Sequence, residues 1–200
     1  MHPVFTARGK SARPIWFVTS STFTKVITGL GKSDRAYVKS AGFEPQAARN
    51  LILPSGGVLF GLESKKEDHN AFLPGLLPGV LPAGSYRFAN APYDARLAAL
   101  AFALGAYRFT RYRKAQQKAV RLVLPAGVDG DDLSRIAEGM TLSRDLINTP
   151  ANDMGPAELE TAARALAKRH GAKSRSISHH RLFFVQKCGD EVCRSAEFSP

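Results

Sequence analysis

The residues that could do chemistry are concentrated in one short basic stretch, RFTRYRKAQQK, at residues 108–118. Its cations are Arg108, Arg111, Arg113, Lys114 and Lys118, and Tyr107, Phe109 and Tyr112 lie beside or among them. Basic residues interleaved with aromatic ones can hold phosphates and stack on bases, so these five cations suggest nucleic-acid or nucleotide contact. A simpler interpretation is the solvated end of a helix, where cations are favoured by the helix dipole. Because no nucleic-acid-binding motif accompanies the stretch, we favour the simpler interpretation.

The sequence contains no complete catalytic constellation. It has no G-x-S-x-G elbow, no H-E-x-x-H helix, no phosphate-binding G-x-x-x-x-G-K-[ST] loop and no G-x-G-x-x-G turn. The acidic run DGDD (129–132) precedes a helical pattern, which predicts caps rather than metal ligands. The run NTPAND (148–153) predicts a turn, because Asn and Asp commonly bond to their own backbone there. We therefore assign no catalytic, metal-binding or cofactor-binding residue.

The two cysteines, Cys188 and Cys193, do not indicate a zinc site. They stand near His179 and His180, but their spacing is not that of a zinc finger or ribbon, and no second ligand pair follows. We expect free thiols in a cytoplasmic protein. The longest apolar run, 97–107, is too short to cross a bilayer, and the N-terminus is a poor signal peptide. No membrane association is expected.

The first 127 residues predict an α/β domain with a mixed sheet covered by helices. Short β-branched and aromatic runs predict strands, and these cover residues 13–19, 50–54, 57–63, 84–90 and 119–125. A helix is predicted within 22–42, and the strongest helical pattern begins after residue 91. Three prolines at four-residue spacing predict an ordered loop or short turns over 69–84.

Two linker helices are predicted over residues 128–172. The first begins near Asp131 and ends before Pro150, and the second runs from Pro156 to His170. Ile147 belongs to an apolar stripe along the first helix, and Leu159 and Leu166 belong to the predicted buried face of the second. Residues 173–200 lack helical periodicity, so we expect a loose, disordered tail with one strand over 181–186.

Four segments resemble a known family in the same order along the chain. They are ARPIWFVT (12–19), LPGLLPGVLPAGSYRFANAP (73–92), ARLAALAFALGAYRFTRYRK (95–114) and RDLINTPANDMGPAELETAARALAKRHGA (144–172). The last is the most specific, particularly in its RDLINTPANDMGP block. Together they resemble the N-terminal domain and linker of the leucyl aminopeptidase (cytosol aminopeptidase) family.

This resemblance implies a macro-domain-like N-terminal domain, connecting helices, and a C-terminal catalytic domain. In the intact family that catalytic domain binds two divalent metals, such as manganese or zinc, and releases N-terminal amino acids from peptides. The family's metal-ligand block, similar to NTDAEGR, is absent from this sequence. We therefore expect a truncated, inactive chain with no cofactor of its own, and a peptide substrate only in the intact family.

The resemblance stops abruptly after residue 172, as a reading-frame shift with early termination would cause. Two other roles stay open. One is a binding module that uses the 108–118 stretch for nucleic acid or a nucleotide. The other is an assembly module, forming a homo-oligomer or joining full-length subunits through the two linker helices, whose apolar stripes would lack part of their packing surface.

Overall fold

The computed structural model describes residues 2–6, 9, 11–65, 69–90, 92–112, 118–177 and 182–186. The chain divides into two units, Met1–Ser143 and Arg144–Pro200, which are treated separately. The predicted boundaries after residues 127 and 172 stay predictions.

A six-stranded mixed sheet organises the described part of the first unit. Its strands are β1 (Phe5–Thr6), β2 (Arg13–Val18), β3 (Asn50–Ile52), β4 (Val58–Gly61), β5 (Gly84–Phe88) and β6 (Val120–Val123). Their order across the sheet is β1-β6-β5-β2-β4-β3. Neighbouring strands are parallel except β3, which pairs antiparallel with β4. The α/β class with a mixed sheet is confirmed, and the macro-domain-like label stays a prediction.

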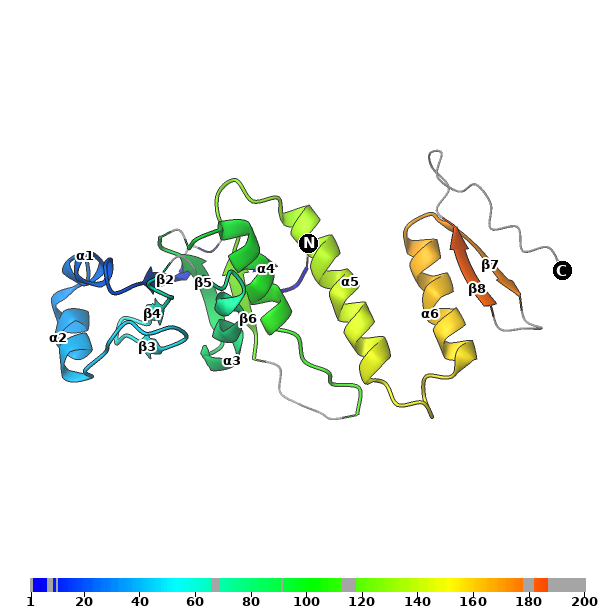
Figure 1. Ribbon diagram of the computed structural model, residues 1–200, viewed down its shortest axis with the longest axis horizontal. Helices are drawn as coiled ribbons and strands as arrows, with labels where there is room; N and C mark the ends of the chain where they lie inside the picture. The colour runs from blue at the N-terminus through cyan, green and yellow to red at the C-terminus, as the bar shows by residue number, and fades with distance from the viewer. Residues whose placement is uncertain are drawn as a thin grey trace. The chain divides into compact units, whose positions relative to one another are not determined.

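Helices lie along both faces of this sheet. They are α1 (Phe23–Thr28), α2 (Lys32–Ser40), the 3₁₀ helix η2 (Leu73–Leu76), α3 (Leu77–Val80), α4 (Ala95–Gly105) and the first part of α5 (Gly130–Asn148). In Figure 1, α3 and α4 lie beside β5 and β6, while α1 and α2 lie together near β2 and β4. Their apolar side chains supply the two cores of the unit.

The two cores follow from strand periodicity, because successive side chains of a strand point to opposite faces. Ile15 and Phe17 of β2 pack on one face, in the core that α3, α4 and α5 complete. Val18 of β2 and Leu59 of β4 pack on the other, beneath α1 and α2. A buried strand that faces both cores must therefore be apolar throughout, as the run IWFV is.

Three local features differ from the sequence-based expectation. The helix expected within 22–42 is two helices, interrupted at Gly29–Gly31. The proline-rich loop contains η2 and α3, because Pro74 and Pro78 occupy first-turn positions, where a missing N–H has no cost. The short strand β1 was not predicted.

The second unit contains the end of α5, then α6 (Pro156–Arg169), β7 (Lys173–Ile177) and β8 (Leu182–Gln186). The N–H of Gly155 donates to Glu158 Oε2 at 3.0 Å, and Gly171 follows α6 with a φ of 63°. Both predicted ends of the helix are therefore correct.

Strands β7 and β8 pair antiparallel within the segment expected to be a loose tail. The strand predicted over 181–186 matches β8, whereas β7 was not predicted. Residues 187–200 lie outside the described residues, so tail disorder stays a prediction.

The apolar stripes of the linker helices are less buried than predicted. Ile147 is 81% exposed, Leu159 48% and Leu166 41%. The predicted buried face of α6 is therefore wrong at Leu159 and Leu166 in this chain, whereas Leu133 and Ala137 of the apolar stripe of α5 are buried.

Candidate functional site

The predicted basic stretch lies beyond a helix rather than on its last turn. Helix α4 ends at Gly105, and residues 107–112 are not helical, which corrects the expectation of a helix end. Arg108 nevertheless interacts with that end, because its Nη1 donates to the carbonyl oxygens of Gly105 at 2.9 Å and Tyr107 at 2.7 Å. A cation is favoured there by the exposed carbonyls and the helix dipole.

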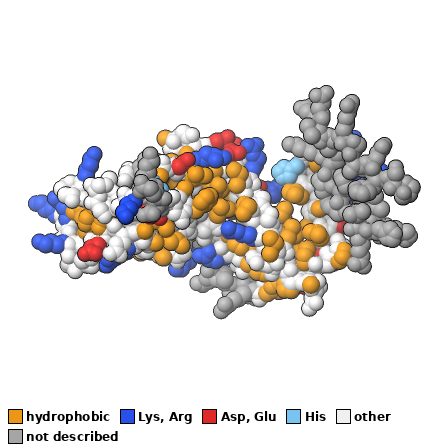
Figure 2. Space-filling model, viewed as in Figure 1, with side chains coloured by type: hydrophobic (Ala, Val, Ile, Leu, Met, Phe, Trp, Pro, Cys, Tyr) orange, Lys and Arg blue, Asp and Glu red, His pale blue; other side chains and the backbone are white. Residues whose placement is uncertain are grey.

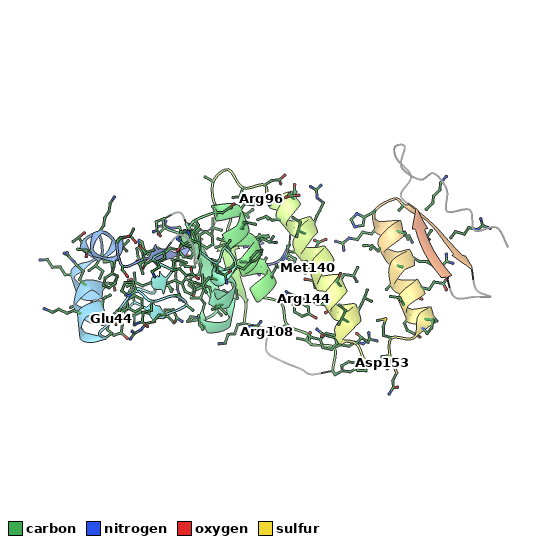
Figure 3. All side chains as sticks on the ribbon, in the orientation of Figure 1. Glu44, Arg96, Arg108, Met140, Arg144 and Asp153 are labelled. Carbon is green, nitrogen blue, oxygen red and sulfur yellow. The ribbon has the colours of Figure 1, made fainter. Side chains whose placement is uncertain are left out.

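The other predicted cations separate into distinct positions. Arg111 places its Cζ 5.8 Å from the ring centroid of Tyr112, and Lys118 lies just before β6. Arg113 and Lys114 lie outside the described residues. Arg108, labelled in Figure 3, and Lys118 share one cavity, whereas Arg111 is not among its lining residues.

This cavity has a volume of about 490 Å³ and lies at the amino ends of β1 and β6. A third cation, Arg121 of β6, also lines it. The remaining lining residues are uncharged: Pro3, Val4, Pro78, Gly79, Ala106, Ala119 and Val120. We refer to this site as the basic cavity. Among the residues that the structure describes, the lining brings three cations and no acidic side chain onto a largely apolar surface.

Arg121 was not predicted because it lies outside the run 108–118, where cations are densest along the chain. Within β6, Val120 and Leu122 are buried and Arg121 is exposed. This alternation follows from the period of a strand, and it was visible in the run AVRLV. Applied to that run, it would have predicted an outward cation at position 121.

The carboxyl ends of β2 and β5 form the usual ligand-binding edge of an open α/β sheet, because the connections of these strands diverge there. Asn90 occupies part of this edge. Its Oδ1 accepts from the N–H of Phe17 at 2.8 Å, and its Nδ2 donates to the carbonyl of Phe17 at 2.7 Å. The amide therefore has a structural role, tying residue 90 to β2.

Tyr93 follows at the same edge and stacks on His69, with ring centroids 3.5 Å apart. Its hydroxyl donates to the carbonyl oxygen of Glu63. Partial burial, followed by the nearby Glu63 carboxylate, raises the pKa of Tyr93 above its usual value. The tyrosine is thus held neutral as a hydrogen-bond donor and is not poised to act as a base.

The acidic run before α5 acts as a cap, as predicted. Asp129 Oδ1 accepts from the backbone N–H groups of Asp131 at 2.9 Å and Asp132 at 3.1 Å. Asp132 Oδ2 also forms an ion pair with Nη2 of Arg96, a residue labelled in Figure 3, at 2.6 Å. Hydrogen bonds from Arg96 and Arg135 lower the pKa of Asp132. These carboxylates are therefore engaged in holding α5.

The predicted turn after α5 is present in the second unit. Residues 151–153 form a turn, with the N–H of Asp153 donating to the carbonyl of Pro150 at 2.9 Å. Thr149 Oγ1 donates to the carbonyl of Asp145 at 2.6 Å. Both contacts serve to end α5.

Among the described residues, no group of three or more His, Cys, Asp or Glu side chains could hold a metal ion. Cys188, Cys193, His179 and His180 lie outside the part of the chain that the structure describes. The described side chains therefore offer no ligand set for the two metals that the family resemblance implies. No described helix is long and apolar enough to cross a membrane.

Comparisons with known proteins identify relatives that match most of this chain. A probable cytosol aminopeptidase of Streptomyces coelicolor is 27% identical over an alignment of 179 residues, and the match covers 78% of this chain and 31% of that protein. The crystal structure of a cytosol aminopeptidase from Coxiella burnetii matches with a TM-score of 0.75 and 30% identity, over 86% of this chain and 39% of that one.

A bottromycin maturation enzyme, BotP, solved in complex with Mn, matches with a TM-score of 0.59 and 21% identity. The match covers 82% of this chain and 38% of BotP, and it supports the fold alone. This chain therefore corresponds to less than half the length of these relatives.

The sequence model of the M17 aminopeptidase N-terminal domain matches residues 14–125, more than half of this chain. The segment runs from β2 to just beyond β6 and includes Arg108, Lys118 and Arg121. The chain belongs to the M17 aminopeptidase family, of which it carries the N-terminal domain.

Proposed function

We propose that this chain is the non-catalytic N-terminal part of a metal-dependent, cytosolic aminopeptidase. In this proposal the chemistry, release of an N-terminal amino acid from a peptide with two bound divalent metals, belongs to polypeptide that corresponds to the remaining length of the relatives. The observation that carries the proposal is the family match over 14–125, together with coverage of only 31% of the Streptomyces relative and 39% of the Coxiella structure.

The charged side chains of the described residues support this division of labour. Asp129 and Asp132 cap and anchor α5, and the carboxylate of Asp34 accepts from the backbone N–H and hydroxyl of Ser55. Hydrolysis by two metals requires several carboxylates directed at a shared point. The carboxylates of Asp34, Asp129 and Asp132 instead hold helices and turns in place.

An assembly role is favoured by the exposed apolar side chains of the second unit. Ile147, Leu159 and Leu166 are all more than 40% exposed, and a leucine gains about 1.5–3 kcal/mol when it becomes fully buried. We propose that these side chains contact further polypeptide of the enzyme, either in the same subunit or in a partner subunit. Without that cover, the same surface favours self-association.

The catalytic part of the proposal is tested by a peptidase assay of the 200-residue chain. Leucine p-nitroanilide is the substrate, with added Mn²⁺, and a full-length cytosol aminopeptidase serves as the positive control. We expect the control to be active and this chain to show only the background rate. Turnover that scales with the concentration of the chain and disappears with a chelator would overturn the proposal.

The assembly part is tested by light scattering. We expect Leu159→Ser combined with Leu166→Ser to lower the average mass of the chain in solution. The matched control is Phe72→Ser, which removes an apolar side chain of similar exposure, 51%, from the first unit. A monomeric wild-type chain, or equal effects of both changes, would refute self-association through α6.

A further inference from the structure

We propose that the basic cavity binds a small phosphorylated organic molecule, with Arg108, Lys118 and Arg121 receiving its phosphate. This inference is independent of the aminopeptidase proposal. A second cavity of about 490 Å³ lies at α1 and α2, but it pairs two cations with Glu44, whose position Figure 3 labels. None of the described residues that line the basic cavity is acidic, so its three cations select for an anion.

Arg108 is already oriented before any ligand arrives. Its Nη1 is held by the carbonyls of Gly105 and Tyr107, which fixes the plane of the guanidinium. A planar guanidinium with fixed orientation loses less entropy on binding an oxyanion than a free side chain. Its Nη2 lies on the side of Gly79, 3.7 Å from where a Cβ on that glycine would be. The absence of a side chain at position 79 therefore keeps space open next to this group.

The other two cations reach the cavity from different segments. Lys118 precedes β6, and Arg121 projects from the exposed register of β6, beyond buried Val120. Figure 2 shows Lys and Arg side chains at several separate places on the face in view, among hydrophobic and acidic ones. Across the whole sequence, 28 Lys and Arg residues stand against 17 Asp and Glu. This excess draws anions to the surface generally, but three cations around one hollow can converge on a single group.

The apolar surface of the cavity indicates that the ligand has an organic part. Pro3, Val4, Pro78 and Val120 contribute to it. A volume of about 490 Å³ lies within the range of small-molecule sites, roughly 300–1,000 Å³. A polynucleotide instead needs an extended basic groove that follows several nucleotides. The cavity therefore favours a compact ligand such as a nucleotide over a nucleic acid.

Isothermal titration of the 200-residue chain tests this with ADP, inorganic pyrophosphate and adenosine as probes. We expect ADP to bind more tightly than either other probe, because it alone has both the phosphates and the organic part. Binding of ADP should weaken at high salt, since exposed charges are screened. Equal binding of ADP and pyrophosphate would restrict the site to an inorganic anion and overturn the proposal, as would no binding of ADP.

Variants locate the binding. Arg121→Gln should weaken ADP binding by about threefold to fivefold, as expected for the loss of one partly solvated ion pair. Gly79→Leu should weaken ADP binding by about tenfold or more, because the new side chain fills the cavity while every cation remains. The matched charge control, Lys32→Gln at an exposed position of α2, should leave the Kd unchanged. Circular dichroism checks that each variant is folded.

Two results would overturn the assignment to this cavity. The first is ADP binding that Gly79→Leu leaves unchanged. The second is a single-stranded oligonucleotide that binds more tightly than ADP and is insensitive to Gly79→Leu, which would indicate an open surface. Neither result depends on peptidase activity, so the proposal can fail while the proposed function stands.

Discussion

Replacing Gly105 with alanine should destabilise the first unit, because this glycine lets α4 approach η2 closely. A Cβ at position 105 would lie 2.7 Å from the carbonyl carbon and 3.0 Å from the Cα of Gly75, and closer still to its carbonyl oxygen. Carbon atoms normally pack 3.5–4.0 Å apart, so the two segments must separate by about 1 Å. The obstacle is backbone, which cannot rotate away as a side chain would.

The expected cost combines two opposing effects. Overpacking in a tight core costs about 1–3 kcal/mol and sometimes more. Alanine is favoured over glycine by up to about 1 kcal/mol in a helix interior, but by less at residue 105, the last residue of α4. We therefore expect a net loss of about 1–3 kcal/mol, or a Tm lowered by roughly 3–10 °C.

Gly139→Ala is the matched control. Gly139 lies inside α5, and a Cβ there would meet no heavy atom within 4 Å. Only the helical preference remains, so we expect a gain of up to about 1 kcal/mol. Fluorescence of Trp16, the single tryptophan, reports on the first unit during thermal or urea unfolding. The reasoning is refuted if Gly105→Ala melts within error of the wild type or shifts in the same direction as the control.

Three further changes test individual contacts by the same unfolding measurement. Asp34→Ala should lower the free energy of unfolding by about 1–3 kcal/mol, because Asp34 is only 7% exposed and its carboxylate accepts from Ser55 N at 3.2 Å and Ser55 Oγ at 2.6 Å. An unchanged urea midpoint would contradict this. Tyr86→Phe should cost about 1–2 kcal/mol, since its hydroxyl donates to the Pro82 carbonyl at 2.9 Å, and a stabilised variant would show that this bond is unfavourable. Burial lowers the pKa of His2, so on acidification the unfolded chain binds a proton at this position before the folded chain does. The free energy of unfolding should therefore fall as pH decreases through about 6.5, the usual pKa of histidine. His2→Gln should flatten that dependence.

The elements predicted correctly are those whose signals are local. β2 and β4 are apolar because they face both cores, and their hydrophobic runs show this without knowledge of the partners. The ends of α6 could be predicted from the sequence in the same way, since Gly155, Glu158 and Gly171 lie within one turn of the helix ends that they define. For such segments the neighbouring residues in the sequence are sufficient to predict the secondary structure.

The features that were missed depend on residues far away along the chain. β1 has only two residues, and its pairing of Phe5 with Leu122 requires that β6 already be in place. The basic cavity likewise joins Arg108 and Lys118, which were predicted, to Arg121, which was not. The sequence indicated the charge correctly, but only the packing of α3, α4 and β6 decides which cations share a hollow.

Helix α6 has both kinds of feature: ends that its own sequence defines, and an apolar face whose burial depends on residues elsewhere. Its capping contacts are made inside its own first and last turns, so they need no surrounding surface. Burial of Leu159 and Leu166 is different, because it needs a surface that α6 itself does not provide. If the relatives' additional polypeptide supplies that surface, α6 should begin and end at the same residues in this chain and in a full-length enzyme. Only its stability against local unfolding should rise, because a helix gains most of its stability from packing its apolar face.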